Sequence, residues 1–214
     1  MHVNRYRSLA RRASLVVAAA STGLALAACG AGNDHSGAAH GAPGGNASAS
    51  AGRYNQADVS FAQQMIPHHR QAVAMAGMAA SHGASPDVKA LAEKIEKAQD
   101  PEIQTMSGWL KAWGAKVPDA MEGMPAMDGT AHGDHASMPG MMGREDMDRL
   151  DGATGKDFDS MFLTMMIEHH EGAIDMAKAE QQKGSSRDAT SMAGDIITAQ
   201  TAEIAQMRQM LGTG

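Results

Sequence analysis

Residues 58–81 alternate apolar and polar positions with the period of an α-helix, which predicts one buried stripe that includes a histidine. The stripe consists of Phe61, Met65, His68, Ala72, Met75 and Ala79. We expect Asp58 to cap this helix and Gly83 to end it. A second helix is predicted for residues 85–113, because Ser85 can cap it and Pro86 suits its first turn. The stripe of this second helix carries one acid, Glu102.

The same pattern returns at a constant offset of 101 residues, without a gap, so that residues 162–211 repeat residues 61–110. The second copy predicts a helix over residues 156–183, a break at Gly184 and a helix over residues 186–211. Each helical hairpin has one apolar face and needs a partner to bury it. The sequence therefore predicts an all-α fold in which tandem hairpins, residues 58–113 and 156–211, form a four-helix bundle with a pseudo-two-fold axis.

Pro67 interrupts the first helix, where the second copy has Glu168. A proline inside a helix removes one backbone hydrogen bond and costs about 3 kcal/mol. One interpretation is a kink that aims His68; the other is that the helix begins at Pro67 and that residues 58–66 form a separate turn.

The N-terminus has the features of an export signal. Residues 1–28 contain four arginines, no acid and an apolar run too short to span a bilayer. The run ends at Cys29, the only cysteine, in a sequence that resembles a bacterial lipoprotein cleavage site. We therefore expect residues 1–28 to be a signal peptide and Cys29 to carry a lipid that anchors the protein outside the cytoplasm. Arg11 and Arg12 leave a twin-arginine route open beside the general one.

Residues 29–53 are rich in Gly, Ala and Ser and are expected to form a flexible tether to a bundle domain over residues 54–213. The formal charge of −6 becomes −10 once the four arginines of the signal are removed. Nucleic acid is therefore excluded as an expected partner. The oligomeric state cannot be deduced from the sequence.

Residues 114–151, which connect the hairpins, combine methionine and histidine with Gly, Pro and Asp. Such a loop is too polar for a core, and exposed methionines are uncommon. Thioethers prefer Cu(I), and imidazole suits Cu(I) and Cu(II). The loop is therefore a candidate copper site with the ligands Met121, Met124, Met127, His132, His135, Met138, Met141 and Met142. A short helix is expected over residues 144–150.

The repeated motif Met-Ile-x-His-His is the leading candidate for metal binding within the bundle. Adjacent helical residues point about 100° apart, so only one histidine of each pair can face the bundle axis. The candidate ligands are His68, His69, His169 and His170 with Met65 and Met166. Glu102 and Glu203 are expected to accept hydrogen bonds from these histidines and fix their tautomers. Alternatively, the histidines are core residues bonded to carbonyls, and the acids form buried salt bridges.

No catalytic arrangement is evident in the sequence. A di-iron centre of the ferritin type needs paired Glu-x-x-His motifs, and the first copy has Pro67 and Arg70 where the second has Glu168 and Glu171. We therefore expect the protein not to be an enzyme, and a copper-dependent redox enzyme is only the third interpretation.

The motif Met-Ile-x-His-His-x-x-Ala-(Val/Ile)-x-Met-Ala, present in residues 61–76 and 158–177, resembles the domain-of-unknown-function 305 family. The resemblance covers residues 54–212, including Met138-Pro139-Gly140-Met141-Met142 before the second motif. It implies a ferritin-like four-helix bundle in secreted or envelope-anchored bacterial proteins, some of which bind copper. The family's histidine pairs correspond to His68-His69 and His169-His170, accompanied by Met65 and Met166.

The sequence as a whole predicts a copper-binding lipoprotein that buffers copper at the membrane or passes it to another envelope protein. The alternative is an interaction module that binds no metal, whose histidines stabilise the core or sense pH.

Overall fold

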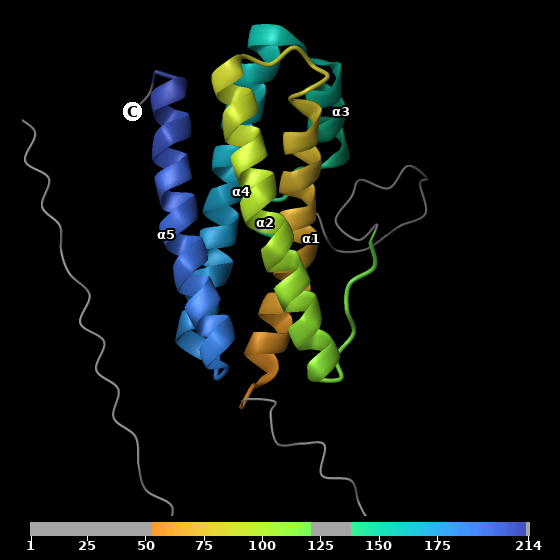
Figure 1. Cartoon of the computed structure of the whole chain (residues 1–214), viewed down its shortest axis with the longest axis vertical. Helices are drawn as coiled ribbons and strands as arrows, with labels where there is room; N and C mark the ends of the chain where they lie inside the picture. The colour runs from red at the N-terminus through yellow and green to blue at the C-terminus, as the bar shows by residue number, and fades with distance from the viewer. Residues whose placement is uncertain (1–52, 121–137, 213–214) are drawn as a thin grey trace, which may run out of the picture. The chain divides into compact units, whose positions relative to one another are not determined.

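The computed structural model describes residues 53–120 and 138–212, which form five helices and no strand (Figure 1). These helices are α1 (Gln56–Met78), α2 (Pro86–Ala112), α3 (Arg144–Gly152), α4 (Gly155–Lys183) and α5 (Arg187–Met210). The prediction of an all-α bundle is confirmed. No helix in the described part of the chain is long and apolar enough to cross a membrane. The signal peptide, Cys29, nearly all of the tether and part of the loop (Met121, Met124, Met127, His132 and His135) lie outside the described residues.

The four long helices form two hairpins that pack side by side. Helix α1 packs along α2 and helix α4 along α5, and the hairpins meet mainly through α1 and α4 (Figure 1). The short helix α3 lies against α1 and α4. The central contact of the domain is therefore between the two helices that carry the histidine motifs.

Helix α1 differs from the expected helix at both ends. Asn55, not Asp58, is the N-cap, and Asp58 completes a capping box by accepting a hydrogen bond from the Asn55 backbone N–H. The helix ends at Met78, one turn earlier than expected, and Gly83 has a φ of +69° in the turn that follows. Because α1 runs without a break through Pro67, the interpretation that the helix begins at Pro67 is wrong.

The apolar core consists of two clusters. The larger cluster contains Phe158, Phe162 and Met166 and extends over α3 and the α1–α2 turn, and the smaller contains Phe61, Met65 and Ile196. Met65 and Met166, placed in the sequence one turn before the histidines, are fully buried. Met65 belongs to the smaller cluster and Met166 to the larger one.

Reciprocal clamps join the two hairpins at opposite ends of the bundle. Asp58, in the first turn of α1, accepts hydrogen bonds from the backbone N–H groups of Ser185 and Ser186 at the α4–α5 turn. Asp159 of α4, 101 residues later, accepts one from the N–H of Ser85 at the α1–α2 turn, at 3.1 Å. Ser85 and Ser186 are the N-caps of α2 and α5. Each first helix thus fixes the turn of the other hairpin.

One clamp contains a second carboxyl group, Glu180 of α4, where the first repeat has Ala79. Glu180 is buried, and its burial, together with the neighbouring Asp58, raises the pKa of Glu180 to about 8. Burial alone would raise the pKa of Asp58, but the neighbouring Glu180 and hydrogen bonds from backbone N–H groups lower it. At neutral pH a protonated Glu180 therefore lies beside an ionised Asp58.

This carboxyl pair predicts that stability falls as the pH rises. Glu180 titrates near 4.5 in the unfolded chain and at about 8 in the folded protein, so the folded state binds the extra proton between these values. The free energy of unfolding should therefore decrease from about pH 4.5 to about pH 8 through this group. A Glu180→Gln variant, which is neutral throughout, should lack this component. The measurement is urea unfolding of both proteins at several pH values, in which the titrating groups remote from Glu180 and Asp58 cancel. If the free energies of unfolding of the two proteins change in parallel with pH, this role of Glu180 is contradicted.

Candidate metal site

The two histidine motifs meet at the contact between α1 and α4. The ring centroids of His68 and His169 are 3.7 Å apart, with an angle of 39° between the ring planes. Both side chains are buried, with 0% and 1% of their surface exposed. Because the motifs occupy equivalent positions in the two repeats, the pseudo-two-fold arrangement brings their first histidines face to face.

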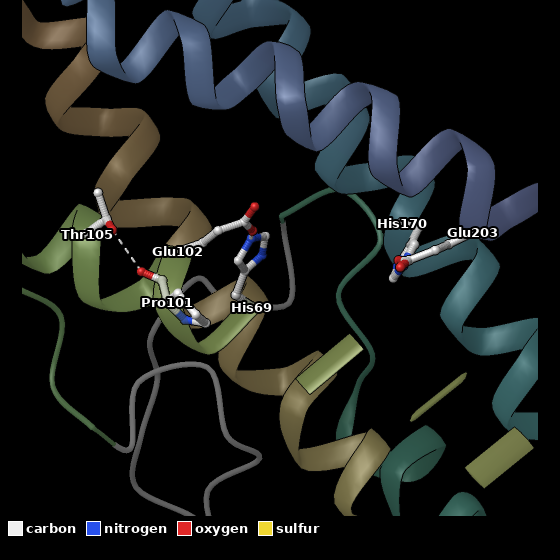
Figure 2. Close-up of polar contacts among 6 residues, drawn as sticks. All are labelled: His69, Pro101, Glu102, Thr105, His170 and Glu203. Carbon is white, nitrogen blue, oxygen red and sulfur yellow. Dashed lines mark hydrogen bonds and ion pairs between the residues drawn. The ribbon is translucent and has the colours of Figure 1, made fainter. Parts of the chain in front are cut away.

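The second histidine of each motif turns toward its own hairpin partner and meets a glutamate (Figure 2). The Nε2 atom of His69 lies 2.7 Å from Oε2 of Glu102 on α2, and Nε2 of His170 lies 2.8 Å from Oε2 of Glu203 on α5. The side chain of Glu102 is 23% exposed and that of Glu203 only 5%. Lys94 of α2 reaches across to Oε1 of Glu203 at 3.3 Å, so the second pair is further enclosed.

Three of the four histidines have an acceptor at Nε2, which fixes their tautomer. Nε2 of His68 lies 3.0 Å from the backbone carbonyl oxygen of Pro139, while His69 and His170 contact carboxylates. A carbonyl oxygen can only accept, so Nε2 of His68 carries the proton; a carboxylate has the same effect on the other two rings. The proton at Nε2 leaves a lone pair on Nδ1, the atom through which such a ring can bind a metal.

These Nδ1 lone pairs have no hydrogen-bond partner. Among the described residues, five buried imidazole nitrogens lack one: Nδ1 of His68, His69, His169 and His170, and Nε2 of His169. The side-chain oxygens of Gln99 and Gln200, one turn before the glutamates, are also buried and without a partner. Native proteins rarely leave so many buried polar atoms unsatisfied in one region. Unpaired imidazole nitrogens of this kind can act as ligands of a metal ion.

The imidazoles facing each other at the centre are held in the neutral form. Burial, with a smaller contribution from His69, lowers the pKa of His68 to about 3. Burial and the neighbouring histidines lower the pKa of His169 well below its ordinary value. Although burial acts to raise it, the pKa of Glu203 is lowered by His170 and Lys94, which favour the carboxylate. Neutral imidazoles supported by ionised carboxylates are the protonation states that metal binding requires.

The residues that the structure describes nevertheless do not form a complete metal-binding site. Across residues 53–120 and 138–212, no three side chains of His, Cys, Asp or Glu are arranged to hold one ion. A metal between α1 and α4 therefore needs either a rotated imidazole ring or a sulfur ligand besides the histidines. Soft ions such as Cu(I) accept sulfur and nitrogen together.

Of the loop methionines within the described residues, Met142 is buried in the larger cluster and Met141 is half-buried. The sequence analysis did not anticipate the role of residues 139–142, whose backbone reaches the histidines. Pro139 binds His68 through its carbonyl oxygen, and Gln71 of α1 binds both backbone groups of Met142. The only signal in the sequence is the run Met138-Pro139-Gly140-Met141-Met142, which indicates thioether ligands and a family resemblance but not a role for its backbone.

The fold matches known structures. A protein from Streptomyces coelicolor described as a secreted DUF305 protein is 29% identical and aligns with 77% of this chain and 94% of its own, with a TM-score of 0.63. CopM in its Cu(II)-bound form is 35% identical over 72% of this chain and 94% of its own (TM-score 0.58). CopM in its Cu(I)-bound form is 33% identical over the same shares (TM-score 0.56).

Comparison with curated protein sequences gives no match. The family described as "Domain of unknown function (DUF305)" matches residues 58–211, which include both hairpins, both histidine pairs and both glutamates. The chain therefore belongs to the DUF305 family.

Proposed function

We propose that this protein binds copper outside the cytoplasm and buffers it or passes it to another protein of the cell envelope. The observation that carries the proposal is the set of five buried nitrogens of the two histidine pairs that have no partner among the described residues. Neutral imidazole binds both Cu(I) and Cu(II). The similarity to CopM, whose structures include Cu(I)-bound, Cu(II)-bound and Ag-bound forms, supports copper as the metal.

The energetic argument favours a ligand over a purely structural role. A buried polar atom without a hydrogen bond costs about 1–3 kcal/mol, and this region contains several. If the histidines served only packing, apolar residues would stabilise the same contact better. A metal that binds the free lone pairs offsets this cost and adds its binding free energy to the folded state.

The alternative, a module whose histidines sense pH, finds less support in the central pair. A pH sensor for the range between pH 5 and 8 needs an imidazole that titrates there. Burial lowers the pKa of His68 to about 3, far below that range. His68 would therefore remain neutral under conditions in which such a switch operates.

The remaining parts of the proposal come from the sequence. We propose that residues 1–28 direct export and that a lipid on Cys29 anchors the protein at the outer face of the membrane. The Met/His-rich loop would supply weaker, exchangeable ligands, which suits transfer rather than permanent storage. We propose binding and transfer, not catalysis, as the activity.

The imidazole pair at the centre should be necessary for tight copper binding. A His68→Leu/His169→Leu variant should lose the tightly bound copper, whereas deletion of residues 121–137 should leave it in place. The control is His82→Leu, which removes a histidine that bonds the Met78 and Asp151 carbonyl oxygens away from the cluster. The measurement is Cu(I) binding in competition with a colorimetric chelator. Because leucine removes unsatisfied polar atoms, the free energy of unfolding of the metal-free variant should lie within about 1 kcal/mol of that of the wild type. Unchanged copper affinity in the double variant would refute the site.

The glutamates should tune the affinity through the imidazoles that they orient. Glu102→Gln and Glu203→Gln should each weaken copper binding by about 10–100-fold, because an amide is a poorer acceptor for the imidazole N–H. Glu93→Gln on α2, whose carboxylate pairs with the exposed Lys97, is the control and should have no effect. The same chelator competition measures all three. Equal affinities in the three variants would show that the glutamates only stabilise the fold.

A further inference from the structure

Residues 138–142 form a strap that crosses the α1–α4 contact one turn from the histidines. Two residues at equivalent positions of the repeats hold it: Gln71, three residues after His68, and Gly172, three residues after His169. Equivalent positions of the two repeats thus carry different residues, a glutamine and a glycine, and both residues contact the strap. This is a local departure from the pseudo-two-fold symmetry.

Gln71 holds the strap by hydrogen bonds to the backbone of Met142. Its Nε2 donates to the Met142 carbonyl oxygen at 2.9 Å, and its Oε1 accepts from the Met142 N–H at 2.8 Å. Gln71 is only 1% exposed, and both hydrogen bonds are buried. One side-chain amide thus satisfies both backbone groups of Met142 in a region where an unsatisfied group would be costly.

Gly172 allows the strap to lie directly on α4. A Cβ atom on Gly172 would be 2.0 Å from the carbonyl oxygen of Pro139 and 2.7 Å from the nitrogen of Gly140. Gly140 has a φ of +75°, and a Cβ there would lie 2.6 Å from the carbonyl oxygen of Glu168. Only glycine fits on both sides of this crossing. The close approach also brings the Pro139 carbonyl oxygen to Nε2 of His68, at 3.0 Å.

Four methionines line a groove beside the strap. The groove has a volume of about 970 Å³, and its walls include Met141 and Met142 of the strap and Met161 and Met165 of α4. In the first repeat the positions of Met161 and Met165 are occupied by Ser60 and Gln64. The repeated helix pattern therefore does not require methionine at these positions.

The charges of the groove favour a cation. Its walls include three acids, Asp146, Asp157 and Glu168, against one basic residue, Arg149, which pairs with Asp146. Thioether sulfur binds soft cations such as Cu(I) and Ag(I), and carboxylates attract positive charge. The strap thus contributes residues to the groove and also contacts the buried His68 through Pro139.

We propose that residues 138–142 act as a gate for the imidazole cluster, and that the methionine-lined groove binds a thiophilic cation before it passes the gate. The structure has the gate closed, with Pro139 bonded to His68. The strap has no regular secondary structure, and the contacts named above hold it, so it can open without unfolding the bundle. The inference rests on the proposed function for the metal, but the gate itself can be tested without any metal.

The gate is tested on the metal-free protein with Gly172→Ala and Gln71→Ala. Both variants should open the strap more often, so that diethyl pyrocarbonate modifies His68 and His169 about tenfold faster or more and the Met142 amide hydrogen exchanges faster. Gly108→Ala, a helical glycine of α2 with no atom within 4 Å of the added Cβ, is the control. Gln71→Ala adds no atoms, so it tests the gate even if Gly172→Ala does not fold. Modification rates equal to the control in a folded variant would overturn the gate.

The groove is tested by the rate at which Cu(I) loads the protein. The change Met141→Leu/Met161→Leu/Met165→Leu keeps the volume of the side chains but removes the sulfur ligands. It should slow loading severalfold, while the amount of copper bound at equilibrium stays the same. Met176→Leu, on α4 outside the groove, is the control and should load at the wild-type rate.

The outcomes separate the two proposals. Wild-type loading by the triple variant, with copper capacity intact, would overturn the role of the groove. If the wild type binds no copper, the proposed function and the groove both fail, and the gate is judged by the metal-free measurement alone.

Discussion

The structure depends on the burial of imidazoles where α1 meets α4. Two apolar helices that meet at this point would pack well with leucine or alanine, yet the chain places His68 against His169 at a centroid distance of 3.7 Å. Such burial is tolerable only because carbonyl and carboxylate acceptors take the Nε2 hydrogens of three of the four histidines. The remaining imidazole nitrogens have no hydrogen-bond partner among the described residues, and these unpaired nitrogens are the groups to which a ligand can bind.

The sequence repeat accounts for the equivalent histidines and carboxylates in the two halves of the domain. Residues that differ between the repeats account for the other contacts around the histidines. Asp58 and Asp159 clamp opposite hairpins with the same chemistry, and Glu102 and Glu203 orient equivalent histidines. Lys94 contacts only the second glutamate, however, and Gln71 faces Gly172 across the strap. A symmetric scaffold thus carries an asymmetric centre, with its cover and its methionine-lined groove on one side.

The sequence predicted the bundle and its histidine motifs because their signal is periodic and repeated. The apolar stripe specified the helices, and the offset of 101 residues placed the two motifs at equivalent positions. The carbonyl of Pro139 could not be predicted, since it is a backbone group 71 residues from His68 that no side-chain pattern marks. The sequence indicates Asp58 as the cap because it lies shortly before the apolar stripe, whereas Asn55 caps the helix three residues earlier. Met65 and Met166 follow the helical stripe as core residues do, so the sequence could not separate packing from metal binding.

The central claim is that imidazoles of both repeats bind one metal between α1 and α4. Anomalous diffraction at the copper edge from crystals loaded with Cu(I) tests it most directly. The account predicts a strong peak between His68 and His169, within bonding distance of a nitrogen from each. Copper peaks only at methionines outside this contact, with the two rings still in contact with each other, would show that the buried histidines are architectural.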